Sequence, residues 1–389
     1  MRIFLHSLCF FFLLISHAAW AAPAFDFTTT EGTETACAQV LRPSPSPAQS
    51  PAEQQAEVIC RDLQLVRHVA TFASKELDVM WRQHASDREF GIAIRRELLH
   101  MRGEMRATRA LLEKIRLRDK TDGLMLEPSQ WIFDLDGNGR IDSWESHLFA
   151  IPRRERAPSK VGMPADDDNY YRSAYQLDAR FLVDQSDVQW ALGYHYFAEA
   201  LVELVLAYQL KGEALTTSSI VLTDPAAMRR SYALLLAGFK STDKLRRMVL
   251  AETDDDHEWI PNPRQQDSVF PVPLDDEDFK VWSAALELII PLLEGKTLLA
   301  PQHLQGGILG GMANLCPNGQ GLSIPAVFRH PPRQILRFLD PGVARSMCQK
   351  IDAAHPQSQL LEVLGRYANR AGRDNEMGMI WLRQLLWGN

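Results

Sequence analysis

The stretch "SDVQWALGYHYFAEALVELVLAYQL", residues 186–210, decides the fold class of this chain. It is apolar on most faces of a helix, and Ser186 or Asp187 is placed to cap its start. Polar side chains recur on one face every four residues, which argues against a membrane span: His195, Glu199 and Glu203. We therefore expect a central helix, buried in the core of an all-α protein.

The rest of the C-terminal half also has helical patterns. Asp224 and Pro225 form a favoured helix start for residues 224–252, and the helix predicted over 275–295 begins with carboxylates and stops at Gly295. Three shorter helices are expected near the end of the chain: 332–339, 342–351 and 379–387. Alternating strand patterns are not found, so the segment 171–389 is predicted to be a helical core domain.

A helical hairpin is predicted over residues 54–120. Apolar residues are spaced by threes and fours from Ile59 to Met80 and again from Ile94 to Ile115. Ser86 and Glu89 form a capping box at the start of the second helix. The short connection implies an antiparallel pair. Five arginines on the second helix predict a solvated basic face, with contact to an anionic lipid or polysaccharide as the alternative: Arg95, Arg96, Arg102, Arg106 and Arg109.

The N-terminal residues predict export. Residues 1–22 have the charged start, apolar run and small-residue end of a signal peptide, and the Pro/Ser-rich segment 23–53 is expected to be a disordered lead-in. The protein is therefore expected in a periplasm or outside the cell, with no transmembrane segment. The formal net charge of −7 argues against nucleic acid as a partner.

Four cysteines remain outside the leader, and an even number in an exported protein suggests disulfides. Three pairings are possible. We expect the two pairs that are local in sequence: Cys37–Cys60 and Cys316–Cys348.

One loop carries the pattern of a cation site: "DLDGNGRIDSWE", residues 134–145. Calcium takes six to eight oxygen ligands, and a tightly turned loop can supply them from nearby residues. Gly139 stands where the chain must turn sharply, and Ile141 is expected to pack inward. Six residues supply the predicted ligands, Arg140 through its backbone carbonyl: Asp134, Asp136, Asn138, Arg140, Asp142 and Glu145.

This loop resembles the EF-hand calcium-binding family, which implies Ca²⁺ as the bound ion. The resemblance covers about twelve to seventeen residues within the region 121–152, and no second loop of this type is found. A solitary loop favours a structural role. We expect calcium to order the loop and to dock the hairpin against the core helices.

Two weaker patterns remain open. The acidic segment 252–258 predicts either a second cation or acid/base site, or a solvated turn that buries Trp259. The stripe of His195, Glu199 and Glu203 fits the wet edge of a core helix or, alternatively, a transition-metal chelate. No nucleophile motif is present.

Two functions follow from these patterns. The first is an exported, non-catalytic calcium-binding scaffold, with the hairpin available to a protein partner. The alternative is an exported hydrolase or metal-dependent enzyme that uses the acidic segment 252–258 with His257 or His195.

Overall fold

The computed structural model describes residues 25–42, 49–83, 85–153, 175–211, 219–271, 274–300, 315–335, 337 and 340–360. The predicted signal peptide, 1–22, and the predicted last helix, 379–387, lie outside the described residues.

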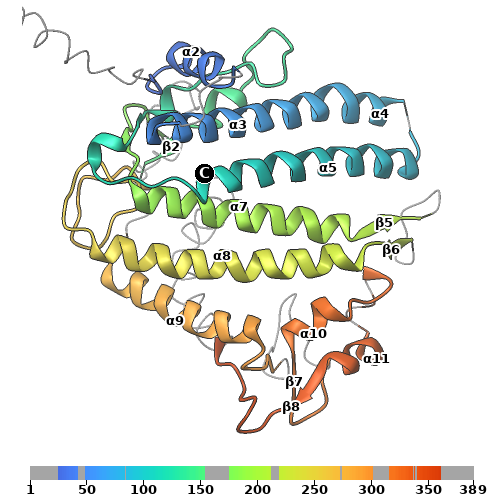
Figure 1. Ribbon diagram of the computed structural model, residues 1–389. Helices are drawn as coiled ribbons and strands as arrows, with labels where there is room; N and C mark the ends of the chain where they lie inside the picture. Colours follow the sequence, from blue (N-terminus) through green and yellow to red (C-terminus); the bar gives the residue numbers. More distant parts are fainter. Residues whose placement is uncertain are drawn as a thin grey trace, which may run out of the picture.

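The protein is mainly α-helical, as predicted. Long helices lie roughly antiparallel in successive layers, and the central helix α7 packs between the hairpin and α8 (Figure 1). In order along the chain these helices are α3 (Pro51–Phe72), α5 (Asp87–Leu112), α7 (Gln185–Leu206), α8 (Pro225–Ala251) and α9 (Asp276–Glu294). Within the described part of the chain, no helix combines the length and hydropathy that a membrane crossing requires.

The predicted hairpin is confirmed. Ser50 and Glu53 form a capping box at the start of α3, and Ser86 and Glu89 form the predicted one at the start of α5. After α3 the chain continues through a π-helical segment, η1 (Ala73–Leu77), and α4 (Asp78–Arg82) before it turns back.

The contact between α7 and α8 is close because small residues line it. A Cβ added to Gly238 on α8 would lie 2.7 Å from the ring of Phe197, so any other residue there would force that ring to shift. Ser231 donates its hydroxyl hydrogen to the Ala200 carbonyl at 2.7 Å. The predicted helix 186–210 is correct up to Leu206, after which the chain forms a strand, β5 (Tyr208–Leu210).

The polar stripe of α7 and the arginine face of α5 both differ from their predicted exposure to solvent. Glu199 and Glu203 are 1% and 0% exposed, so this face is not the wet edge of the helix. Both carboxylates accept hydrogen bonds from the guanidinium of Arg106, at 3.1 and 3.2 Å. Arg109 also binds Glu199, and Arg230 on α8 binds Glu203. The arginine face of α5 is therefore only partly solvated: Arg96 and Arg106 remain exposed, whereas Arg109 is mostly covered by α7.

Short strands, which the sequence did not predict, form four two-stranded antiparallel ladders among the described residues. Besides β5 with β6 (Ile220–Leu222), the pairs are β1 (Met125–Leu126) with β4 (Phe181–Leu182), β2 (Ile151–Pro152) with β3 (Tyr175–Gln176), and β7 (Gln320–Leu322) with β8 (Cys348–Lys350). Of the helix predicted over 342–351, only a short helix, α11 (Pro341–Ala344), and one 3₁₀ turn are present. The rest of that prediction is wrong, because the chain continues as β8.

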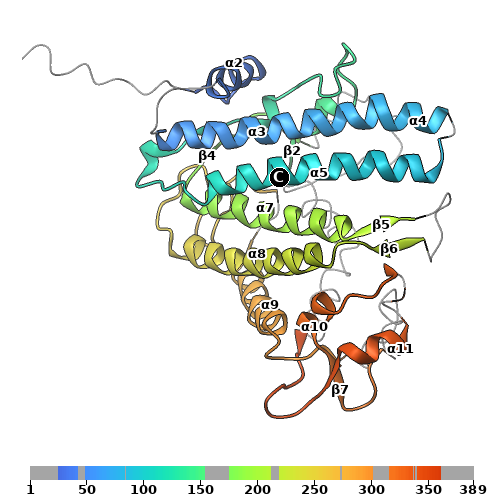
Figure 2. The same ribbon diagram turned by 45° about the vertical axis from the view of Figure 1, so that its right-hand side comes forward.

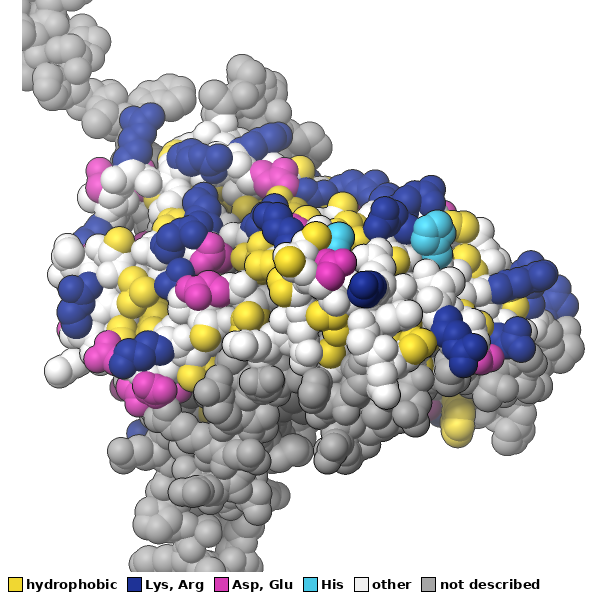
Figure 3. All heavy atoms as spheres, turned by 90° about the horizontal axis from the view of Figure 1, so that it is seen from below, with side chains coloured by type: hydrophobic (Ala, Val, Ile, Leu, Met, Phe, Trp, Pro, Cys, Tyr) yellow, Lys and Arg dark blue, Asp and Glu magenta, His cyan; other side chains and the backbone are white. Residues whose placement is uncertain are grey.

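The last described elements form a small lobe under α8, beside α9 (Figure 2). This lobe holds α10 (Ile324–Arg329), α11 and the β7–β8 pair. Seen from below, Lys and Arg side chains are spread over the described surface among hydrophobic and acidic ones (Figure 3). The charge of this face is therefore mixed, although the whole chain is acidic.

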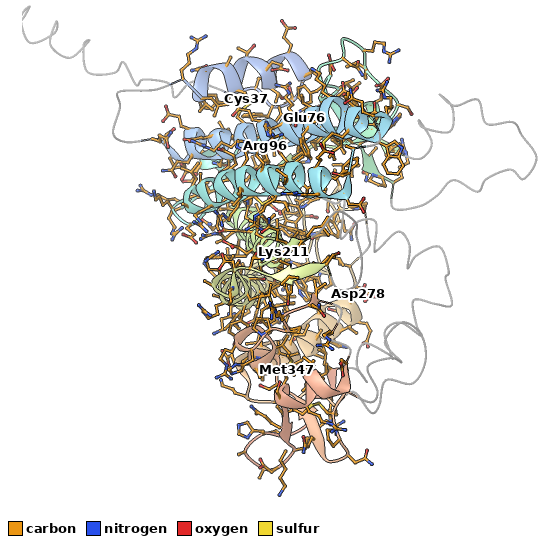
Figure 4. All side chains as sticks on the ribbon, turned by 90° about the vertical axis from the view of Figure 1, so that its right-hand side faces the viewer. Cys37, Glu76, Arg96, Lys211, Asp278 and Met347 are labelled. Carbon is orange, nitrogen blue, oxygen red and sulfur yellow. A yellow bond between two sulfur atoms is a disulfide. The ribbon has the colours of Figure 1, made fainter. Side chains whose placement is uncertain are left out.

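Both predicted disulfides are present: Cys37–Cys60 and Cys316–Cys348, with S–S distances of 2.02 and 2.07 Å. The first joins α3 to a helix that the sequence did not predict, α2 (Thr30–Val40), on which Cys37 is labelled in Figure 4. The expectation of a disordered segment over 23–53 is therefore wrong for α2, because Thr29 caps this helix and the disulfide ties it to α3.

Candidate metal centre

The loop 134–145 is held at its entrance by buried aromatic and apolar residues. Trp131, Phe133 and Leu135 are 8%, 2% and 2% exposed and belong to the core beneath α3. The indole of Trp131 donates its Nε1 hydrogen to the Phe27 carbonyl at 2.9 Å. The exit is a single 3₁₀ turn, η4 (Glu145–His147), so the segments next to the loop are an extended strand-like stretch and a short turn.

Three predicted ligands converge. Oxygen atoms of Asp134, Asp136 and Glu145 all lie within 4.8 Å of one another. Glu145, the last residue of the loop, is fully buried and reaches back to its start. Its Oε1 accepts the amide hydrogens of Leu135 at 2.7 Å and Asp136 at 3.2 Å. Backbone amides therefore hold the Glu145 carboxylate in place beside the two aspartates.

The glycine turn forms the outer half of the loop. Asp134 accepts the amide hydrogens of Gly139 at 2.9 Å and Asn138 at 3.0 Å. These hydrogen bonds, that of Gly139 first, hold the pKa of Asp134 below its usual value. Gly137 and Gly139 have φ angles of +67° and +84°, which glycine adopts without steric cost.

Asp142, the remaining carboxylate among the predicted ligands, is not part of this group. The Asn138 side chain donates to Asp142 Oδ2 at 2.8 Å and accepts the Arg140 amide hydrogen at 2.8 Å. The Arg140 side chain is 77% exposed and points outward, as expected. Ile141, expected to pack inward, is 46% exposed instead, since no described strand lies beside the loop to cover it.

The loop contacts the hairpin directly. Lys75, in the π-helical segment η1, donates to the Gly137 carbonyl at 3.3 Å, and the Thr71 hydroxyl donates to the Asp136 carbonyl at 3.4 Å. The guanidinium of Arg67 lies over the Phe133 ring, 4.9 Å from its centre. The position of the loop is thus tied to that of the end of α3.

A second carboxylate group lies at the ends of α7 and α8. Oxygen atoms of Asp184, Glu252 and Glu258 lie within 4.8 Å of one another. The sequence indicated the two glutamates but missed Asp184, which is far away along the chain. The sequence feature that could have located Asp184 is its capping box with Asp187, because this box fixes where α7 begins.

This second group is not the solvated acidic turn that the sequence suggested, although Trp259 is buried as expected. Glu258 is only 6% exposed, and burial beside other carboxylates raises its pKa to about 7. Burial likewise raises the pKa of Glu252 to about 8 and that of Asp187 well above its usual value. Glu252 and Glu258 therefore bind protons more tightly than exposed glutamates do.

The two histidines of the enzyme alternative contact other carboxylates. His257 Nδ1 lies 3.0 Å from Asp267 Oδ2, and His195 Nε2 lies 3.1 Å from Asp62 Oδ2. Asp254 and Asp256 pair with Lys120. Two cavities of about 300 and 260 Å³ lie beside α2, and neither is lined by a residue of either carboxylate group. Both histidines thus pair with carboxylates that lie outside the segment 252–258.

The comparisons with known proteins give no match to a family model, a curated protein or a solved structure.

Proposed function

We propose that this is an exported calcium-binding protein, in which one Ca²⁺ ion at residues 134–145 has a structural role. The observation that carries the proposal is the convergence of Asp134, Asp136 and Glu145, with Glu145 fully buried. The loop has the residue pattern of an EF-hand loop, and three of its carboxylates already lie close together.

The charge of the loop supports a dication. Three carboxylates within 4.8 Å repel one another, and a divalent ion between them replaces this repulsion with attraction. Calcium takes six to eight oxygens. The remaining ligands would come from Asn138, Asp142 and the Arg140 carbonyl once the contact between Asn138 and Asp142 opens.

The surroundings of the loop support a structural and non-catalytic role. The loop lies against α3 and rises from the core that α3 shares with the start of α7. An ion that makes the loop more rigid would therefore also restrict the end of α3, which the loop contacts. The hairpin would then present a fixed surface to a protein partner.

Two disulfides suit an oxidising compartment, which agrees with the export predicted from residues 1–22 and with a periplasmic or secreted protein. Extracellular calcium modules bind at about 10⁻⁴–10⁻³ M, and a solitary site of this kind needs no tighter affinity to be filled outside the cell.

Calorimetric titration tests the proposal. The chain without its predicted leader, stripped with EGTA, should bind one Ca²⁺ per molecule, and Glu145→Gln should lose that ion. Glu287→Gln, an exposed carboxylate on α9, is the matched control and should bind as the parent does. Calcium binding that is unchanged in Glu145→Gln, or absent from the parent at millimolar Ca²⁺, would refute the assignment.

A further inference from the structure

A donor set of a different kind lies between the two hairpin helices. Glu97 and His100 are three residues apart on α5 and so share one face. His68 comes from α3, and its Nε2 lies 2.9 Å from Glu97 Oε2. Cross-helix ion pairs flank this contact on both sides: Arg61 with Glu104 at 3.6 Å, and Glu76 with Arg96, which lie side by side in Figure 4.

Glu97 is not satisfied by its neighbours. It is only 6% exposed, yet its Oε1 atom is buried without a hydrogen-bond partner among the described residues. A buried carboxylate oxygen without a partner carries the full cost of its lost hydration. The contact with His68 involves the other carboxylate oxygen, Oε2.

The ring of His100 lies against the His68 ring that contacts this carboxylate. The ring centres of His68 and His100 are 4.2 Å apart, and the planes are tilted by 49°. Both side chains are exposed, His68 by 46%, so the donors can be reached from solvent. Two imidazoles with one carboxylate suit zinc, copper or nickel ions, whereas calcium prefers oxygen ligands alone.

We propose that His68, Glu97 and His100 bind one divalent transition-metal ion of the zinc class across the hairpin. His68 and Glu97 are already adjacent. The donor atoms of all three residues do not yet lie within 4.8 Å of one another, so the exposed His100 side chain has to turn toward the ion. The ion takes up the free oxygen of Glu97 and links α3 to α5.

Zinc titration of the full mature chain, without an affinity tag and with the calcium loop saturated, tests this site. The parent should bind one Zn²⁺ ion at this site. His68→Gln and His100→Gln should each weaken binding by at least about tenfold, since even indirect contacts to a metal ligand are worth about 10–100-fold. Circular dichroism verifies that these surface variants fold.

Two controls separate this site from other zinc binding. His330→Gln, an exposed histidine in the C-terminal lobe, should bind as the parent does, and Glu145→Gln should keep its zinc. Substitution with Co²⁺ gives an independent readout, because the visible spectrum of the bound cobalt should change in His100→Gln. Zinc affinity that is equal in the parent and both hairpin histidine variants would overturn the proposal, as would zinc lost in Glu145→Gln alone.

Discussion

Arg109 donates from Nε to Glu199 Oε2 at 2.7 Å, and this contact joins the hairpin to the central helix α7. Glu199 is almost completely buried, and Glu203, one turn along, is fully buried beside Arg106 and Arg230. Guanidinium groups from α5 and α8 thus neutralise two carboxylates of α7. Because an unpaired charge in this position would be costly, the network fixes which faces of the three helices meet.

Loss of one partner in this network should destabilise the protein strongly. We expect Glu199→Gln to lower the free energy of unfolding by about 2 kcal/mol, because it removes the charge-assisted hydrogen bonds that the buried Glu199 accepts from Arg106 and Arg109. Urea denaturation measures the change. Asp78→Asn removes an exposed ion pair with Arg82 and should cost less than about 1 kcal/mol. Equal losses in the two variants would contradict the buried network.

Calcium should stabilise the folded chain by mass action. At a free concentration of about a hundred times the dissociation constant, the free energy of unfolding should rise by about 2.7 kcal/mol. Urea denaturation in calcium and in EGTA measures this difference, which should vanish in Glu145→Gln and persist in Glu287→Gln. A difference of the same size in Glu145→Gln would place the responsible ion elsewhere.

The second carboxylate group should make stability depend on pH. Its folded pKa values are raised, to about 8 for Glu252 and about 7 for Glu258, so the folded state holds protons that the unfolded chain releases. Their contribution to stability is therefore complete below the unfolded pKa of about 4.5 and is lost as the pH rises through about 7 to 8.

Glu252→Gln isolates this effect, because glutamine stays neutral throughout. The thermal midpoint of the parent should fall relative to that of the variant between about pH 5 and pH 8.5. Glu287→Gln on α9 serves as the control and should follow the parent. Parallel pH profiles for the parent and Glu252→Gln would show that the group does not hold a proton.

The disulfide Cys37–Cys60 should contribute to stability mainly by restricting the unfolded chain. It closes a loop of 23 residues, so replacing both cysteines with serine should cost roughly 3 kcal/mol. Limited proteolysis should then cut within α2 (Thr30–Val40) before it cuts α3. Protection of α2 that equals that of the parent would mean that packing alone holds this helix.

The sequence predicted those features that depend on local patterns. The hairpin follows from apolar spacing and from the Ser86 and Glu89 capping box, both of which act within a few residues. The convergence of Asp134, Asp136 and Glu145 is likewise local, because twelve residues around two glycines leave few ways to place the oxygens.

Features that need distant residues were missed. Glu199 looked like a solvated position because its arginine partners lie about ninety residues earlier in the chain. Asp184 lies beside Glu252 and Glu258 only because α7 and α8 pack side by side, which the sequence pattern does not show. Ile141 was expected inside because the loop pattern places an apolar residue there, yet no described strand lies beside the loop to cover it.

The Phe27 carbonyl accepts hydrogen bonds from the Trp131 indole and the Glu127 amide, about a hundred residues further along. A ribosome makes the accepting residue first and its donors much later. Residues 25–29 can therefore make these contacts only after the segment 127–131 has been synthesised. This contact therefore depends on residues that follow both hairpin helices, the second of which ends at Leu112.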